Sequence, residues 1–282
     1  MAAIALGLLS SVLWGLSDYL GGLKSRTFPV PVVLAMMYLT SLTVMLVFIA
    51  ARGEGPPPAE NVLASLGAGL VGIAALAAFY RALAIGTMSI VAPIASTGVA
   101  LPVIVGLIGG DRPGVAGSVG LALAVVGIVL ASREDDEGTA DVRLQRLSIV
   151  LAIVAGLGFG SYFVLAEIGS SGDVGWALLL SRTSAFPIIA ALAFVALRRG
   201  GARPGGRVAA VLAGIGLLDL GANFFYNYAT TIGELSSVAV ASSLYPVTTV
   251  MLAALLLGER LQGVQRIGVI VALVGVVLIA AG

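Results

Sequence analysis

The stretch FYRALAIGTMSIVAP, residues 79–93, shows the pattern of the whole chain: two apolar runs separated by a very short polar break. The break is Gly86-Thr87-Met88-Ser89, and Arg81 lies just before it. A related stretch, FYNYATTIGELSSVAV at residues 225–240, has Asn227 in place of the arginine. Apolar segments that are joined by tight turns and repeated late in the chain favour membrane helices arranged in two related halves.

The composition supports a membrane protein. Of the 282 residues, 59% are apolar and only 10% are charged, which is far from the balance of a soluble domain. The net charge of +1 gives no sign of a nucleic-acid partner. The chain has no cysteine and no histidine, so it lacks thiolate metal ligands and the usual proton relay of neutral pH. We expect neither a metal nor a cofactor.

Apolar segments near the length of about 20 residues that one bilayer crossing requires occur ten times. They predict an all-α integral membrane fold with a first five-helix unit at residues 1–132, a charged linker at 133–146 and a second unit at 147–282. The ten segments run from Ala2 to Gly21, Val30 to Ala51, Asn61 to Ile85, Ser89 to Gly109, Gly114 to Ser132, Leu147 to Glu167, Val174 to Leu197, Val208 to Ile232, Ser236 to Leu257 and Val264 to Ala281.

Short motifs recur at nearly constant spacing in the two halves. Gly110-Asp111-Arg112 returns 148 residues later as Gly258-Glu259-Arg260, and Trp14-Gly15 matches Phe159-Gly160 after 145 residues. Five crossings are an odd number, so the two halves would enter the bilayer from opposite sides, as in the inverted repeats of secondary transporters. The alternative is a duplication that only enlarged the bundle.

These motifs carry a family resemblance. Trp14-Gly15 in the first helix, the Gly-Asp/Glu-Arg motifs and the Val-Gly-rich closing helices resemble the drug/metabolite transporter superfamily, and more narrowly its ten-helix EamA-type exporters. The resemblance implies efflux of small metabolites; such exporters include bacterial exporters of amino acids, aromatic ones among them. The chain departs from the family pattern at Tyr38, where members often have an arginine, whereas Arg182 occupies the matching place in the seventh helix.

Polar and aromatic residues at helical spacing indicate the helix faces that line a pathway. In the eighth helix Asp219, Asn223 and Tyr226 share one face, which is turned away from lipid. The first helix presents Trp14 and Asp18 in the same way. Aromatic residues also serve as packing or interfacial anchors, which is the alternative for each of them. The substrate contacts that we predict are Trp14, Tyr80, Tyr162, Asn223, Tyr226, Ser96 and Ser243.

Charged residues inside apolar segments need partners or water, because each costs about 2.5 to 3.5 kcal/mol near the centre of a membrane helix. Their depths in the predicted helices suggest that Arg182 pairs with Asp219 and that Asp18 pairs with Arg81. The pairs could gate the pathway, or Arg182 and Asp219 could orient an α-carboxylate and an α-ammonium group. The alternative is a purely structural ion pair.

Prolines predict bends beside the cavity. Pro93 and Pro102 lie in the fourth predicted helix and Pro246 in the ninth, which is its repeat mate. Each removes a backbone hydrogen bond and can kink its helix.

The loop charges predict the orientation in a cell inner (plasma) membrane. Lys and Arg gather in the loops that follow the odd-numbered helices, while the opposite side has only Arg52 and Arg112. The positive-inside rule then places both termini outside the cytoplasm. The basic residues of the first group are Lys24, Arg26, Arg133, Arg143, Arg146, Arg198, Arg199, Arg203, Arg207, Arg260 and Arg266.

Together these features predict a monomeric or homodimeric exporter of small amphipathic metabolites, amino acids first, that works by alternating access and has the lipid bilayer and its substrate as partners. A multidrug or nucleotide-sugar transporter would share the fold, and the latter would need more basic residues at mid-depth. A membrane enzyme would need a nucleophile, metal site or acid/base pair, which the sequence does not suggest. A channel would have a ring-like polar pore instead of two inverted halves.

Overall fold

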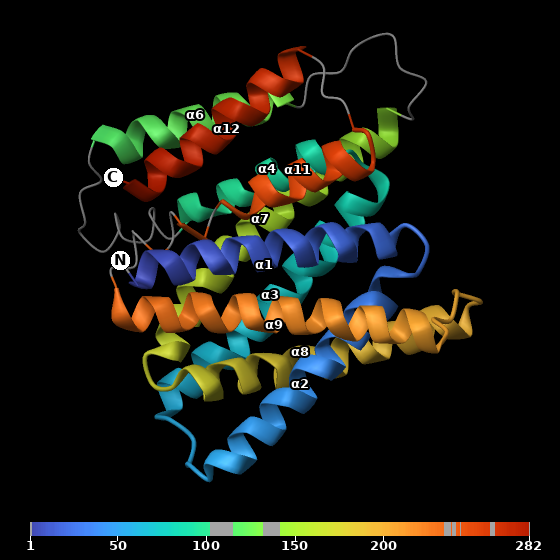
Figure 1. Ribbon diagram of the computed structural model, residues 1–282, viewed down its shortest axis with the longest axis vertical. Helices are drawn as coiled ribbons and strands as arrows, with labels where there is room; N and C mark the ends of the chain where they lie inside the picture. Colours follow the sequence, from blue (N-terminus) through green and yellow to red (C-terminus); the bar gives the residue numbers. More distant parts are fainter. Residues whose placement is uncertain are drawn as a thin grey trace.

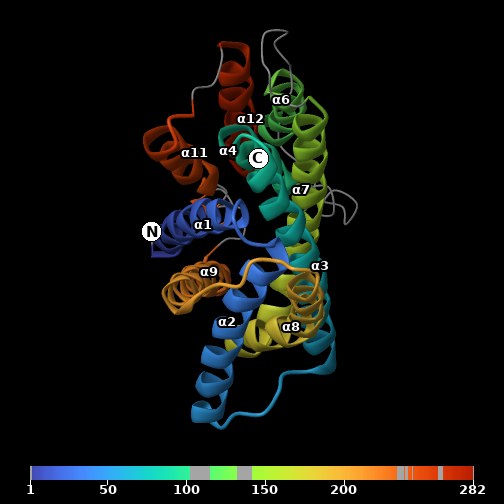
Figure 2. The ribbon, with the colours of Figure 1, turned by 90° about the vertical axis from the view of Figure 1, so that its right-hand side faces the viewer.

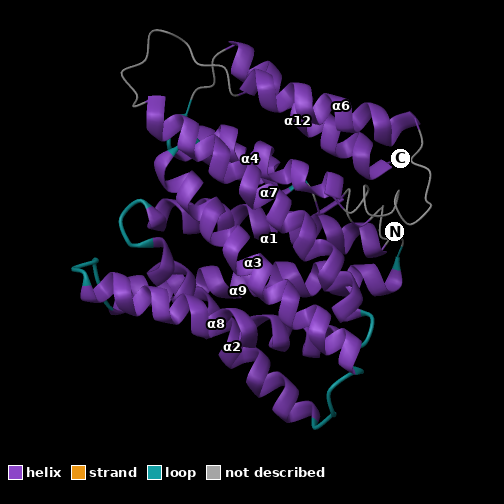
Figure 3. Cartoon of the chain, turned by 180° about the vertical axis from the view of Figure 1, so that it is seen from behind, coloured by secondary structure: helices purple, strands orange, loops and turns teal. Residues whose placement is uncertain are grey.

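The computed structural model describes residues 2–101, 115–131, 142–233, 238, 241, 242, 244–259 and 263–281. Within these ranges every regular element is helical (Figure 3). The helices are α1 (Ala2–Ser25), α2 (Val30–Arg52), α3 (Ala59–Ile85), α4 (Met88–Ser96), the 3₁₀ helix η1 (Thr97–Val99), α6 (Val115–Ala131), α7 (Val142–Ser170), α8 (Val174–Arg198), α9 (Gly206–Ile232), α11 (Tyr245–Leu256) and α12 (Gly263–Ala281).

The helices run roughly side by side, and the start of α1 and the end of α12 lie at the same end of the bundle (Figure 1). Helices α1, α9 and α11 form one layer, and α3, α7 and α8 lie opposite them (Figure 2). Helices from the two halves of the chain pack on each other: α1 on α9, α3 on α7, α2 on α8 and α6 on α12. The two halves are therefore interleaved and do not form separate bodies.

The helix lengths support a multi-pass membrane protein. Six described helices are long and apolar enough to cross a membrane, namely α1, α2, α3, α7, α8 and α9. The other four predicted crossings coincide with α4, α6, α11 and α12, of which the structure describes 9, 17, 12 and 19 residues. Ten crossings therefore stay a prediction.

Large apolar side chains cover the outside of the bundle. Val47, Leu63 and Leu255 are 66%, 70% and 73% exposed, and Phe194 is 59% exposed. An apolar surface of this extent would be unfavourable in water but matches the hydrocarbon of a bilayer.

Small polar side chains join the helices inside the bundle. Ser10 Oγ donates to the Ala222 carbonyl at 2.8 Å and thereby links α1 to α9. Ser41 Oγ donates to the Gly216 carbonyl at 3.1 Å and links α2 to α9. The hydrophobic effect does not drive helix association within lipid, so close packing and such hydrogen bonds replace it.

Glu259, which follows α11, contacts both the start of α4 and the basic residues after α1. Its Oε2 accepts hydrogen bonds from the backbone N–H of Ser89 at 3.0 Å and from Ser89 Oγ at 2.9 Å. Its Oε1 lies 3.4 Å from Nη2 of Arg26. Ser89 is in the first turn of α4, where backbone N–H groups have no partner within the helix. The Gly-Glu motif after α11 thus fastens α11 to the start of α4 and to the end of α1; its repeat mate, Asp111, lies outside the described residues.

Candidate substrate cavity

A cavity lies among helices of both halves, and its space, counted with its open mouth, is about 990 Å³. The lining residues are Trp14, Asp18, Tyr38, Gly72, Leu76, Ala95, Ser96, Val99, Phe159, Tyr162, Phe163, Glu167, Arg182, Asp219, Asn223, Tyr226, Ser242 and Tyr245.

Aromatic rings form a continuous wall of the cavity. The ring centroids of Trp14 and Tyr226 are 5.6 Å apart, and those of Phe163 and Tyr226 are 5.1 Å apart. Trp14 also meets Tyr245 edge-on at 6.4 Å. The rings come from α1, α7, α9 and α11, so a ligand that stacks on them contacts four helices at once.

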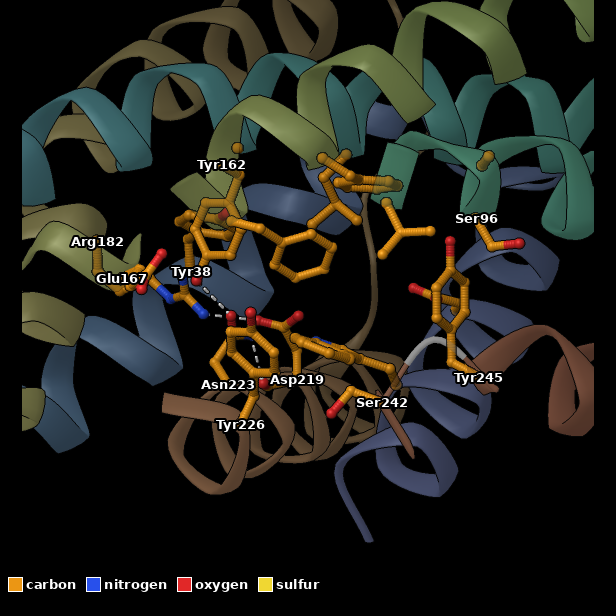
Figure 4. A pocket seen from close by; sticks show the side chains of 18 residues that line it. Tyr38, Ser96, Tyr162, Glu167, Arg182, Asp219, Asn223, Tyr226, Ser242 and Tyr245 are labelled. Carbon is orange, nitrogen blue, oxygen red and sulfur yellow. Dashed lines mark hydrogen bonds and ion pairs between the residues drawn. The ribbon is translucent and has the colours of Figure 1, made fainter. Parts of the chain in front are cut away.

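An ion pair forms the charged centre of the cavity. Nη2 of Arg182 donates to Oδ2 of Asp219 at 2.8 Å, and both residues are buried. The guanidinium also lies over the ring of Tyr38, with its Cζ 4.7 Å from the ring centroid, a cation–π contact. The pair predicted from helical depth is therefore present, and α2 supplies an aromatic platform for it (Figure 4).

Hydrogen bonds extend from this pair to α7. Tyr162 Oη donates to Oδ1 of Asn223 at 2.6 Å, and Asn223 Nδ2 donates to the backbone carbonyl of Asp219 at 2.7 Å. Asp219, Asn223 and Tyr226 all line the cavity, as their helical spacing predicted.

The expected pairing of Asp18 with Arg81 is wrong. Asp18 is 6% exposed and lines the cavity, whereas Arg81 is exposed and forms no ion pair among the described residues. The physical reason is helical rotation: successive residues lie about 100° apart, and the inward position is taken by Tyr80. Asp18 is thus left in the cavity without a cationic partner.

Tyr80, a predicted substrate contact, does not line the cavity. It is fully buried, its ring packs against Gly21, and its hydroxyl donates to the backbone carbonyl of Ser17 at 3.3 Å. The tyrosine therefore fills the interface between α1 and α3, on the side of the cavity that Glu259 closes. Tyr226, which the predicted repeat matches to Tyr80, faces the cavity, so the two positions differ.

The proline positions differ from one another. Pro93 lies inside α4, which gives way to the 3₁₀ turn η1 after Ser96, and Ser96 Oγ donates to the Pro93 carbonyl at 2.8 Å. Pro246 does not kink a helix interior: it lies in the first turn of α11, where proline needs no hydrogen-bond donor. Pro102 and Ser243 lie outside the described residues.

Several lining residues with large or charged side chains were not among the predicted contacts, including Tyr38, Phe163, Glu167 and Tyr245. A signal for two of them exists in the sequence, because Phe159, Phe163 and Glu167 follow one another at a spacing of four residues on one helix face. Tyr38 and Tyr245 look like ordinary apolar positions until their neighbours are known.

The combination of a membrane-embedded helical bundle, a central cavity and a few polar groups on an aromatic wall defines a class of protein, the membrane transporters of small molecules. The family model of the EamA-like transporter family matches residues 1–133 and 146–281. The chain therefore belongs to that family and is a multi-pass membrane transporter.

Comparison with solved structures shows the same fold elsewhere. One crystal structure superimposes with a TM-score of 0.64 at 16% sequence identity, and the match covers 98% of this chain and 95% of that one. No curated protein matches the sequence.

Proposed function

We propose that this protein exports small amphipathic metabolites across the inner (plasma) membrane by alternating access, with amino acids, aromatic and hydrophobic ones included, as the first candidates. The observation behind this proposal is the cavity itself. It combines an aromatic wall with an ion pair, an amide and phenol hydroxyls. Such a site encloses a hydrophobic side chain and still offers partners to polar groups.

Reciprocal helix packing supports two inverted repeats. Helix α1 packs on α9 and α11 of the second half, and α7 packs on α3 and α4 of the first half. The matched Trp14-Gly15 and Phe159-Gly160 motifs have equivalent surroundings. A Cβ on Gly15 would meet Thr248 of α11 at 2.4 Å, and a Cβ on Gly160 would meet the Gly98 carbonyl beside α4 at 2.3 Å. The two segments that match the family model have nearly the same boundaries as the proposed repeats.

The charge distribution supports an orientation with both termini outside the cytoplasm. Helices α1 and α8 end on the side of the bundle opposite the termini (Figure 1). Lys24, Arg26, Arg198 and Arg199 lie at or directly after these two helix ends. That end is closed by Glu259 and by fully buried residues such as Leu83 and Met88. The lining residue Glu167 is exposed near the end of α7, on the side of the termini. We infer that the cavity opens to the outside and that alternating access requires release of the Glu259 contacts.

The polar groups of the cavity fit the backbone of an amino acid. Nε of Arg182 has no hydrogen-bond partner in the part of the chain that the structure describes, and Asn223 and Tyr162 lie next to the ion pair. A substrate carboxylate could bind the guanidinium, because arginine provides five donors in one plane. Its ammonium group could bind the nearby carboxylates.

A second candidate, a cationic drug, is favoured by the excess of acidic residues. Asp18, Glu167 and Asp219 line the cavity, and Arg182 is the one basic residue among the described lining residues. A nucleotide sugar is disfavoured by the same count, because a diphosphate requires several cationic partners.

Counterflow in proteoliposomes tests the proposal. Vesicles loaded with unlabelled substrate are diluted into labelled amino acids, cationic drugs or sugar nucleotides, and entry of label is followed. We expect transient accumulation of aromatic and hydrophobic amino acids and none of sugar nucleotides. Accumulation of cationic drugs alone would replace the proposed substrate class.

A further inference from the structure

Asp18 is a buried carboxylate that no described side chain neutralises. It is 6% exposed, and the described residues provide no hydrogen bond or ion pair to it. It nevertheless lines the cavity. Removal of an ionised carboxylate from water is very costly unless a cation compensates it, so the empty site favours the protonated form and the ionised form requires a cationic ligand.

The groups around Asp18 do not supply that cation. The titratable groups near it are Asp219 of α9, Tyr80 of α3 and Tyr245 of α11. Asp219 is an acid that is already paired with Arg182, and Tyr80 donates its hydroxyl to Ser17. Tyr245 has a hydroxyl with no hydrogen-bond partner among the described residues.

Aromatic rings lie beside this carboxylate. Trp14 is one helical turn from Asp18 on the same face of α1, and its ring meets Tyr245 at 6.4 Å. A carboxylate with adjacent aromatic faces is suited to an organic ammonium group, because it combines opposite charge with cation–π contact.

We propose that Asp18 binds the ammonium group of the transported molecule and that a proton and this ammonium group compete for the same carboxylate. The proposal rests on the proposed function and deepens it: the substrate class becomes amphipathic organic cations and the ammonium end of amino acids. In each exchange the Asp18 carboxyl group loses its proton to water as the ammonium group binds, and it takes up a proton when the ammonium group leaves. Asp219 is less suited to this exchange, because Arg182 neutralises it.

Three ligands that share a phenyl group distinguish the contribution of the ammonium group from that of the carboxylate. Phenethylamine has only an ammonium group, 3-phenylpropionate only a carboxylate, and phenylalanine both. Their binding can be followed by the fluorescence of Trp14 in a Trp176→Phe background, because the chain has two tryptophans. We expect Asp18→Asn to raise the Kd of phenethylamine at least about tenfold, with phenylpropionate binding no weaker than before. Asp18→Glu should recover part of the affinity.

Glu60→Gln is the matched control, since it removes one acidic charge from an exposed residue that does not line the cavity. Its effect on phenethylamine should stay within about twofold. A quaternary analogue, phenethyltrimethylammonium, keeps its charge at every pH. Its Kd for the wild-type protein should rise as the pH falls, and this dependence should disappear in Asp18→Asn.

The proposal is overturned if folded Asp18→Asn binds phenethylamine as tightly as the wild type, or loses affinity for all three ligands equally. If Asp18→Asn does not fold, a pH-independent Kd of the quaternary ligand in the wild type overturns it instead. These results are distinct from failure of the proposed function. If counterflow by Asp18→Asn equals that of the wild type, the protein is a transporter but Asp18 does not bind the substrate. If ligand binding depends on Asp18 but no counterflow occurs, the binding site is supported and the proposed transport is not.

Discussion

Asp18 and Asp219 line the same cavity and are equally buried, each with 6% of its surface exposed. Asp219 has Arg182 at 2.8 Å, whereas Asp18 has no cationic partner among the described residues. The difference shows that burial alone does not define the role of an acidic residue. We therefore expect a structural role for the paired aspartate and a ligand-binding role for the unpaired one.

The largest effect is expected from breaking the pair. Arg182→Ala leaves Asp219 buried without a partner and should lower the free energy of unfolding by about 3 to 5 kcal/mol. A denaturant titration in mixed micelles measures this loss. The double variant Arg182→Met with Asp219→Leu should regain most of the stability but not the transport, because it removes both charges together. Equal stability of wild type and Arg182→Ala would contradict a structural role for the pair.

A steric change on the helix of Asp219 should have a smaller effect. A Cβ on Gly216 would lie 2.5 Å from the Met37 carbonyl, so Gly216→Ala must move α9 away from α2. We expect a loss of about 1 to 3 kcal/mol. Gly214→Ala, two residues away, is the control, because a Cβ there meets nothing within 4 Å. If both variants unfold at the same temperature, close packing of α9 on α2 is not required.

Substitution of the unpaired aspartate, Asp18, should not lower the stability of the protein. Asp18→Asn replaces a carboxyl group that is neutral without a bound cation by a neutral amide of similar shape, so we expect stability to be unchanged or higher by up to about 1 kcal/mol. The midpoint of thermal unfolding in detergent checks the sign. A loss as large as that of Arg182→Ala would mean that Asp18 is a structural residue, and the contrast between the two aspartates would disappear.

The smallest effect is expected at the bundle surface. Nη2 of Arg52 lies 2.9 Å from Oδ2 of Asp173, and the Asp173 side chain also caps α8 by accepting from the Trp176 N–H. Partial burial raises the pKa of Asp173, but these hydrogen bonds outweigh it and hold the pKa below its usual 3.8. Arg52→Gln should cost less than about 1 kcal/mol at neutral pH, as exposed pairs do.

The pH dependence of that pair has a definite sign. Because the folded-state pKa of Asp173 is lowered, its contribution is present above the usual value of 3.8 and is lost as the pH falls through the folded-state value. The stabilities of wild type and Arg52→Gln should therefore converge in acid. A difference that grows as the pH falls would exclude the proposed pair as its cause.

Helical spacing predicted what one helix presents, but not how neighbouring helices face it. The stripe of Asp219, Asn223 and Tyr226 could be predicted because all three residues belong to α9. Tyr80 was misplaced because repeat symmetry suggested a cavity position, whereas the close approach of Gly21 on α1 provides a packing site for its ring. Tyr38 could not be found, since its role depends on Arg182, which is 144 positions away in sequence and adjacent only in space.

The membrane fold and the family were predictable because composition and hydropathy depend on many residues at once. The Arg182–Asp219 pair could be suggested from depth, because two opposite charges in apolar helices require partners. The absence of a described cationic partner for Asp18 could not be predicted, since it depends on the direction in which the Arg81 side chain points from α3.

Alternating access is tested most directly by a single cysteine in the cavity. The chain has no cysteine, so Ser96→Cys provides one thiol on the lining, and the unmodified chain is the blank. A membrane-impermeant thiol reagent is added to right-side-out or to inside-out vesicles. We predict labelling from both faces of the membrane and protection by a transported amino acid. Labelling from one face only, with and without substrate, would contradict alternating access.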